Sequence, residues 1–327
     1  MRVADPARLD PQARALIERI AASGAPPLHT LSPGEARRVY RESRAALAPA
    51  PPHVAEIREL SVPGSERALR ARLYRPRSGE ESLPGVVYFH GGGFIYGDID
   101  THDAVCRGIA QSTPCAVVSV GYRLAPENKF PAAAEDAYRA TVWVSASCAA
   151  LGIDPARLVV AGDSAGGNLA AVTALTARDA GGPAIAMQVL VYPTTDFASE
   201  AESIARFASG YLLTRESIRW VKRSYLRDER DAEDWRASPL RAGDFSGLPA
   251  AYIITAGFDP LRDEGRAYAD RLAQAGVSVT QESFEGQVHG FLVMGGALAA
   301  AGHAIQRIGQ MMRTRFGITP RIRPRTA

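Results

Sequence analysis

Short apolar runs alternate with stretches of helical periodicity over most of this chain. Six such runs follow one another between residues 84 and 284, and helical patterns separate several of them. Strands that are apolar at nearly every position are buried on both faces, which is typical of parallel strands covered by helices. The six runs are Pro84–His90, Ala116–Tyr122, Leu158–Gly162, Ile185–Tyr192, Ala251–Ala256 and Val277–Phe284.

Two alternating β-like runs precede these six. Val54–Val62 and Leu69–Tyr74 flank the turn-forming sequence Pro63-Gly64-Ser65, so they predict an antiparallel hairpin. We therefore expect an α/β fold with an eight-stranded, mostly parallel sheet and helices on both faces. In this prediction only the first pair of strands is antiparallel.

Two regions outside the strand and helix alternation have helical patterns. The first runs to about residue 50 and ends at the proline-rich segment Ala48-Pro-Ala-Pro-Pro52. The second lies between about residues 196 and 240, where Ser203–Arg227 is helical in pattern and rich in aromatic residues. An insertion of this length between two strands suggests a cap over the strand ends. We expect residues 1–327 to form a single domain.

Composition narrows the classes of protein that this chain can represent. With 327 residues and 46% apolar residues, the chain can bury a large core, and its formal charge of +3 is close to balance. The sequence contains neither a basic face nor a nucleic-acid-binding module, and no run of about 18 apolar residues long enough to span a membrane. Three cysteines without a C-x-x-C spacing disfavour a disulfide framework and a zinc site, and no apolar signal core follows Met1. We expect a cytoplasmic protein.

A glycine-flanked serine joins one apolar run to a helical segment. Gly162, Ser164 and Gly166 form the pattern G-x-S-x-G directly after the run that begins at Leu158. This pattern is typical of a nucleophile elbow, a sharp turn that projects the serine hydroxyl above the sheet. Glycine at the flanking positions allows the tight backbone approach that such a turn requires. The alternative is an ordinary Gly-Ser turn between a strand and a helix.

A second glycine-rich stretch, His90-Gly-Gly-Gly-Phe94, directly follows the run Val86-Val-Tyr-Phe89. Loops of this kind present backbone N–H groups to a developing oxyanion, and the N–H of Ala165 after the serine would add another donor. The alternative is a phosphate-binding loop, but the stretch has neither G-x-G-x-x-G nor G-K-[ST]. We interpret His90 as a structural residue that holds the loop by hydrogen bonds.

Two histidines are candidates for the base that a nucleophilic serine needs. In proteins with a nucleophile elbow the acid and then the histidine follow the serine along the chain, which leaves His289 and His303. His303 lies in the helix-like segment Ala297–Met312, whereas His289 and Gly290 follow the last predicted strand. We therefore favour His289.

Two aspartates, Asp196 and Asp259, each follow an apolar strand and are candidates for the acid. Asp259 precedes Pro260, so its ordinary role would be to cap a helix that begins with proline. Its catalytic role would be to orient the imidazole and stabilise the imidazolium. We favour Asp259 because its strand is nearest in sequence to His289; Asp263, one turn into the next helix, is less well placed.

These stretches together resemble a bacterial hormone-sensitive-lipase-like carboxylesterase of the α/β-hydrolase superfamily. The resemblance implies that Ser164 is the nucleophile, Asp259 the acid and His289 the base. It also implies oxyanion N–H groups from Gly92, Gly93 and Ala165, with Gly91 as a possible replacement for one glycine, and a cap made of about residues 1–50 and 196–240. The motifs that carry it are His90-Gly-Gly-Gly-Phe94, Tyr122-Arg-Leu-Ala-Pro-Glu127, Gly162-Asp-Ser-Ala-Gly-Gly167, Asp259-Pro-Leu-Arg-Asp-Glu264 and His289-Gly-Phe291.

The function that follows from this resemblance is hydrolysis of short- to medium-chain monoesters through an acyl-serine intermediate. No cofactor or metal is expected, the partner is a small-molecule ester, and a homodimer is a further possibility. Two alternatives are an amidase or peptidase with the same residues, and a non-catalytic small-molecule receptor on the same fold. The acyl pocket is expected to be lined by Phe94, Tyr96, Leu212 and Trp220.

Overall fold

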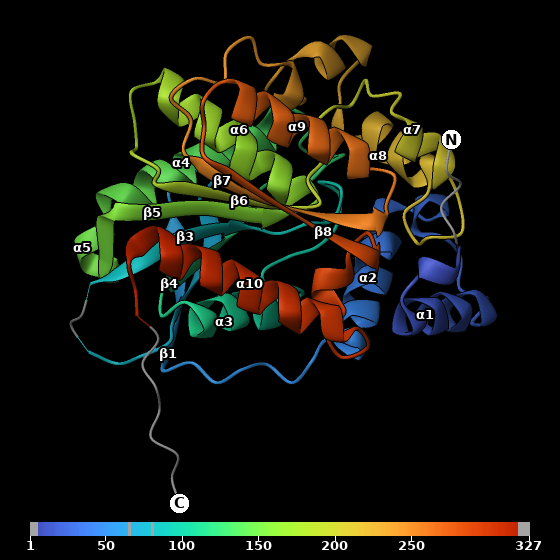
Figure 1. The fold of residues 1–327 in the computed structure, drawn as a ribbon, viewed down its shortest axis with the longest axis horizontal. Coiled ribbons are helices and arrows are strands. Elements are labelled where there is room, and N and C mark those ends of the chain that lie inside the picture. The colour runs from blue at the N-terminus through green and yellow to red at the C-terminus, as the bar shows by residue number, and fades with distance from the viewer. Residues whose placement is uncertain (1–5, 65–66, 80–81, 320–327) are drawn as a thin grey trace, which may run out of the picture.

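An eight-stranded sheet forms the centre of the computed structural model, which describes residues 6–64, 67–79 and 82–319 (Figure 1). The strands are β1 (Glu56–Val62), β2 (Leu69–Arg75), β3 (Leu83–Phe89), β4 (Ala116–Gly121), β5 (Ile153–Asp163), β6 (Met187–Val191), β7 (Ala250–Phe258) and β8 (Val279–Val288). The helices are α1 (Pro11–Ala22), α2 (Pro33–Leu47), α3 (Asp103–Ser112), α4 (Ala132–Ala146), α5 (Cys148–Leu151), α6 (Ala165–Asp179), α7 (Glu202–Arg206), α8 (Arg215–Tyr225), α9 (Arg262–Gln274) and α10 (Ala299–Phe316). Short 3₁₀ helices are η1 (Pro6–Arg8), η2 (Leu28–Thr30), η3 (Glu229–Glu233), η4 (Pro239–Arg241) and η5 (Phe291–Val293).

The strand order is β1-β2-β4-β3-β5-β6-β7-β8. Strand β2 is antiparallel to both β1 and β4, and the other neighbouring strands are parallel. The expectation that only the first pair is antiparallel is therefore wrong. The link from β2 to β3, residues 76–82, is too short for the crossover that strands of the same direction need. Strand β2 must therefore run opposite to β3, and thus opposite to β4.

Helices cover both faces of the sheet, as the apolar runs predicted. Along β3, Val87 and Phe89 join the core beneath α4, α6 and α9, whereas Val86 and Tyr88 join the core against α3 and α10. The two layers of helices lie above and below the sheet in Figure 1. Because successive side chains of a strand point to opposite faces, one apolar run supplies both cores.

The N-terminal segment folds into helices with strong start signals. Helix α1 begins after Asp10, whose carboxylate accepts the N–H of Gln12 at 2.8 Å, and has proline as its first residue. Ser32 and Glu35 form a capping box at the start of α2, which also begins with proline. Both arrangements satisfy N–H groups that have no partner within the helix.

Helices α1, α2, α7 and α8 gather at the right of Figure 1, the side toward which the arrows of the parallel strands point. The N-terminal segment touches the insertion there, since His29 Nδ1 lies 3.2 Å from the Ser217 hydroxyl of α8. Helix α2 also contacts the segment after the glycine-rich loop, because Arg37 donates to the carbonyl oxygens of Ile95 and Ala125, each at 2.8 Å. Across the described ranges, no helix is long and apolar enough to cross a membrane.

Candidate active site

Ser164 lies on the turn between the end of β5 and the start of α6. Its backbone has φ 55° and ψ −118°, a conformation that residues with a side chain seldom adopt. The flanking glycines make this turn possible: a Cβ on Gly162 would lie 2.3 Å from Gly166, and one on Gly166 would lie 1.9 Å from the carbonyl oxygen of Phe89. Backbone strain of this kind costs roughly 1–3 kcal/mol and persists where the surrounding packing holds it.

A continuous hydrogen-bonded chain runs from Ser164 through His289 to Asp259. His289 Nε2 lies 2.9 Å from Ser164 Oγ, and His289 Nδ1 lies 2.8 Å from Asp259 Oδ2. His289 directly follows β8 and Asp259 directly follows β7, so parallel neighbouring strands bring both side chains to the edge of the sheet where β5 presents the serine. With Asp259 fully buried, its carboxylate is held away from water.

The other candidates for base and acid are engaged elsewhere. His303 lies on α10, where its ring packs edge-on against Phe284. The Asp196 carboxylate accepts the Arg241 guanidinium at 2.7 Å, and Asp263 accepts the N–H of Ser203 at 2.9 Å. The capping role considered for Asp259 is not present, because α9 begins at Arg262 after Leu261 and no side chain of the described residues caps it. The Asp259 Oδ1 instead accepts the N–H of Leu261 at 2.9 Å in the turn before this helix.

Three backbone N–H groups near Ser164 are available to bind an oxyanion. Within the described residues, those of Gly92, Gly93 and Ala165 donate to no protein acceptor. The N–H of Gly91 instead lies 3.0 Å from Asp163 Oδ1, so this glycine is already bonded and cannot serve as the replacement donor. Gly92 has φ 121°, and a Cβ there would lie 2.0 Å from the Tyr96 carbonyl oxygen, which explains why this position requires glycine.

His90 holds the glycine-rich loop from within the protein. Its Nδ1 lies 2.8 Å from the Gly91 carbonyl oxygen, and its ring stacks on Tyr122, whose hydroxyl donates to the His90 carbonyl oxygen at 2.8 Å. Burial and the nearby His102 lower the pKa of His90 to about 4. The imidazole is therefore neutral at neutral pH, and its Nδ1–H can donate to Gly91.

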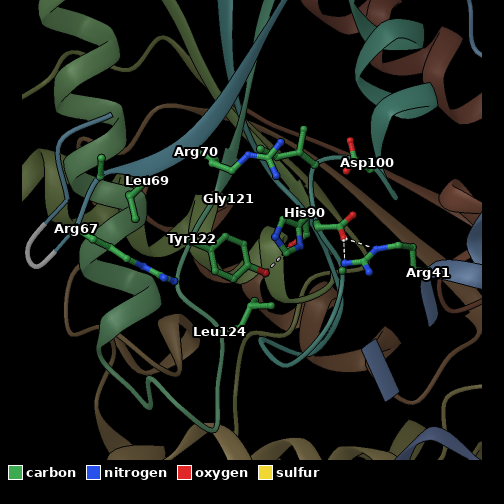
Figure 2. A pocket seen from close by; sticks show the side chains of 13 residues that line it. Arg41, Arg67, Leu69, Arg70, His90, Asp100, Gly121, Tyr122 and Leu124 are labelled. Carbon is green, nitrogen blue, oxygen red and sulfur yellow. Dashed lines mark hydrogen bonds and ion pairs between the residues drawn. The ribbon is translucent and has the colours of Figure 1, made fainter. Parts of the chain in front are cut away.

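His90 also lines a cavity of about 320 Å³, whose lining side chains are drawn in Figure 2. Arg41, Arg67 and Arg70 line the cavity, and the Arg41 guanidinium is bonded to Asp98 at 2.8 Å. Because neither Ser164 nor His289 lines it, this cavity is not the expected acyl pocket.

The four residues expected to line the acyl pocket occupy different environments. Phe94 has no exposed surface and stacks on Tyr225 with ring centroids 3.8 Å apart, so it packs the insertion onto the body of the protein and does not line an open pocket. Tyr96 is half-buried between Tyr40 and Trp220, at centroid distances of 4.5 and 6.2 Å. Leu212 is also half-buried, beside Tyr211 in the apolar cluster that contains Phe207.

Sequence reasoning missed a buried polar group next to the serine. Asp163 is 2% exposed, and the Tyr88 hydroxyl, the Gly91 N–H and His102 Nε2 all lie within 3.2 Å of its Oδ1. A signal was available, because a carboxylate at the end of an apolar strand must find donors when it is buried. His102 could not be found in this way, since only the fold brings it to Asp163.

Comparison with known proteins places the chain in a family. The family described as "alpha/beta hydrolase fold" matches residues 86–293. A carboxylic ester hydrolase of Mycobacterium tuberculosis is 45% identical over 81% of this chain and 73% of its own length. An ethyl acetate hydrolase of Pseudomonas putida is 40% identical over 84% of this chain and 88% of its own. A solved ester hydrolase from the metagenome of Lake Arreo has a TM-score of 0.92 at 41% identity, covering 94% of this chain and 99% of that one.

The chain belongs to the α/β-hydrolase fold family. The expected resemblance to hormone-sensitive-lipase-like carboxylesterases is confirmed, and so is the class of enzyme, a carboxylic ester hydrolase.

Proposed function

We propose that Ser164 is the nucleophile of this serine carboxylesterase, His289 its general base and Asp259 the acid that orients the imidazole. The observation that carries this assignment is the hydrogen-bonded chain Ser164–His289–Asp259, with distances of 2.9 and 2.8 Å, at a strained strand-to-helix turn. A histidine bonded in this way to a serine also argues against the alternative of a non-catalytic receptor, for which such a pair has no use.

In the first half of the reaction, Ser164 Oγ attacks the ester carbonyl carbon while His289 Nε2 takes the hydroxyl proton. The carboxylate of Asp259 stabilises the resulting imidazolium through Nδ1–H. The carbonyl oxygen becomes an oxyanion that accepts the N–H groups of Gly92, Gly93 and Ala165. When the tetrahedral intermediate collapses, the bond to the alcohol oxygen breaks and His289 returns its proton to the leaving alcohol.

In the second half, water attacks the acyl-serine. His289 takes a proton from the water, and the same N–H groups stabilise the second oxyanion. Collapse releases the carboxylic acid, and the proton returns from His289 to Ser164 Oγ. The enzyme thus begins and ends the cycle with a neutral imidazole.

The cap proposed for about residues 1–50 and 196–240 limits the size of the substrate. Its two parts are in contact through His29 and Ser217, and the α8 residue Val221 lies so close to Gly93 that a Cβ on this glycine would be 2.6 Å from it. A roof of this kind leaves room for a short apolar acyl chain, with Tyr96, Leu212 and Trp220 as its walls. We propose short- to medium-chain monoesters as substrates, with the highest kcat/KM between butyryl and octanoyl esters; the ethyl acetate hydrolase among the relatives supports a small ester.

The test is a panel of p-nitrophenyl esters from acetyl to palmitoyl, assayed beside the matching p-nitroanilides and the variant Ser164→Ala. We expect a maximum at intermediate acyl length, little turnover of the anilides, and no turnover by Ser164→Ala above the uncatalysed rate. Faster hydrolysis of anilides than of esters would support the amidase alternative. Ester turnover by purified Ser164→Ala would overturn the assignment of the nucleophile.

A cytoplasmic location and a homodimer remain predictions. The cysteines Cys106, Cys115 and Cys148 are all buried as free thiols, which agrees with a reducing compartment. Cell fractionation tests the location, and light scattering after size-exclusion chromatography tests the dimer.

A further inference from the structure

The segment His90–Phe94, here called the oxyanion loop, is tied to the nucleophile turn by a buried carboxylate. Asp163 immediately precedes Ser164, and its Oδ1 accepts the Tyr88 hydroxyl at 2.8 Å and the Gly91 N–H at 3.0 Å. Burial alone would raise the pKa of Asp163, but the charge and hydrogen bond of His102 and the bond from Tyr88 outweigh it and keep the pKa below its usual range. Asp163 is therefore a carboxylate at neutral pH.

His102 supports this carboxylate from the side of α3, where it is fully buried. Its Nε2 lies 3.2 Å from Asp163 Oδ1, and its Nδ1 lies 3.0 Å from Thr101 Oγ1 and 3.3 Å from the Asp98 carbonyl oxygen. The Thr101 hydroxyl donates to the same carbonyl oxygen at 2.9 Å, so it can accept from Nδ1. Both ring nitrogens therefore face acceptors, and Nε2–H donates to Asp163.

The Gly91 N–H lies almost as close to His102 Nε2, at 3.2 Å, as to the carboxylate. We assign it to Asp163, because a carboxylate is the stronger acceptor and Nε2 carries a proton. A Cβ on Gly91 would lie 2.4 Å from Asp163 Oδ2, so the loop and the carboxylate are in close contact. The peptide that precedes the free N–H groups of Gly92 and Gly93 is thus fixed relative to the residue that precedes the nucleophile.

We propose that Asp163 and His102 are positioning residues that hold the oxyanion loop in register with Ser164. Asp163 fixes Gly91 directly, and His102 fixes the orientation of the Asp163 carboxylate. The inference rests on the proposed function, since it requires Ser164 as nucleophile and Gly92 and Gly93 as oxyanion donors. Asp163 and His102 should therefore affect stabilisation of the transition state and not binding of the ester, because neither side chain reaches the substrate.

The test compares His102→Leu, which removes the donor, with His102→Gln, whose amide N–H can occupy the place of Nε2–H. We expect His102→Leu and Asp163→Asn to lower kcat by about 10- to 100-fold, the range for a displaced oxyanion donor, while KM stays within about two-fold. His102→Gln should retain kcat within about three-fold of the wild type. Each kcat is calculated from the concentration of active Ser164, titrated with a fluorophosphonate, so that misfolded protein does not lower it.

A second readout separates positioning from folding. A trifluoromethyl ketone analogue of the substrate forms a hemiketal whose oxyanion occupies the same N–H groups, so its inhibition constant should rise in parallel with the fall in kcat/KM. The control is Glu282→Gln, which alters another tyrosine–carboxylate bond, from Tyr252 at 2.7 Å, away from the oxyanion loop. It should lower the melting temperature and leave kcat and the inhibition constant unchanged.

The outcomes are distinct. If His102→Leu and Asp163→Asn lower only the melting temperature or the titratable fraction, with kcat per serine and ketone affinity unchanged, the pair is merely structural and the inference is wrong. If these variants do not fold, Tyr88→Phe, which removes one donor and keeps the ring, should still lower kcat and weaken the ketone by several-fold, and an unchanged value would also overturn the inference. Activity retained by Ser164→Ala would instead overturn the proposed function.

Discussion

Asp259 holds His289 through one carboxylate oxygen, while the backbone N–H of Leu261, just before α9, holds the other. Its Oδ2 lies 2.8 Å from His289 Nδ1, and its Oδ1 accepts the N–H of Leu261 at 2.9 Å. With both oxygens occupied, the carboxylate cannot rotate without breaking a bond in a fully buried place. The imidazole therefore presents Nε2 to Ser164 in one orientation.

The variant Asp259→Asn should keep the shape of this contact but lose its charge. An amide that donates to Nδ1 leaves the proton on Nε2, where it blocks proton transfer from Ser164, so we expect kcat to fall by roughly 10⁴-fold. Asp196→Asn is the matched control, because Asp196 also follows a strand but is bonded to Arg241. Steady-state kinetics of both purified variants decide the assignment, and a larger loss for Asp196→Asn would move the acid to the loop after β6.

The nucleophile turn depends on glycine where the backbone of β3 passes close by. We expect Gly166→Ala to lower the free energy of unfolding by about 3 kcal/mol and to reduce the titratable serine, because its Cβ would lie 1.9 Å from the Phe89 carbonyl oxygen. Gly302→Ala on α10 is the control, since a Cβ there has no neighbour within 4 Å and alanine favours a helix by roughly 0.5–1 kcal/mol. Urea unfolding measures the stability of both variants, which should fall for Gly166→Ala and rise for Gly302→Ala. Equal changes would mean that the turn relaxes to accept a methyl group.

Local patterns along the chain predicted the sheet and the residues that gather around Ser164. Six apolar runs and two alternating runs predicted the eight strands, and Asp259 and His289 were found because each follows one of the apolar runs. The predicted strand boundaries were less accurate. Strand β5 begins at Ile153, five residues before the apolar run that predicted it. In this added polar stretch, only Ile153 pairs with β3, opposite Leu83.

Contacts between distant segments could not be predicted in this way. The Gly91 N–H was one of three equivalent loop donors in the sequence, and only its position beside Asp163, 72 residues away, removes it from the oxyanion site. Phe94 looked like a pocket residue because it follows the glycines, but its positive φ of 61° turns the ring toward Tyr225 of the insertion. Neither a backbone angle nor a partner so far along the chain has a local signature.

Burial of His90 should make the protein less stable in mild acid. The pKa of His90 is about 4 in the folded protein, against 6.5 for an ordinary histidine. The unfolded chain therefore binds a proton that the folded chain does not, so this contribution to stability is complete above pH 6.5 and is lost progressively down to about pH 4. Since one pKa unit corresponds to about 1.4 kcal/mol, roughly 2 kcal/mol should be lost between pH 7.5 and pH 5.

The variant His90→Asn isolates this loss, because its amide can still donate to the Gly91 carbonyl oxygen but does not titrate. His102, Asp98 and Asp163 are present in both proteins, so the comparison isolates the imidazole of His90. We expect urea unfolding at pH 7.5 and pH 5 to show a fall in stability that is larger by about 2 kcal/mol for the wild type than for the variant. Equal falls would mean that His90 becomes protonated in the folded protein.

The aromatic contacts of the cap should separate residues that set substrate size from residues that only pack. Trp220 and Leu212 are half-buried, so if either lines the proposed acyl pocket its replacement by alanine opens space, and the preferred acyl chain should become longer. Each additional methylene that is buried contributes about 0.8 kcal/mol, close to a four-fold gain in kcat/KM for the longer ester. Phe94→Ala is the control: its ring is fully buried against Tyr225, so we expect a loss of about 3–5 kcal/mol in stability without a longer optimum. The ester panel and the urea midpoints, measured on all three variants, test which residues set substrate size and which only pack. A shift toward longer esters in Phe94→Ala, but not in Trp220→Ala or Leu212→Ala, would place the pocket on the other side of the oxyanion loop.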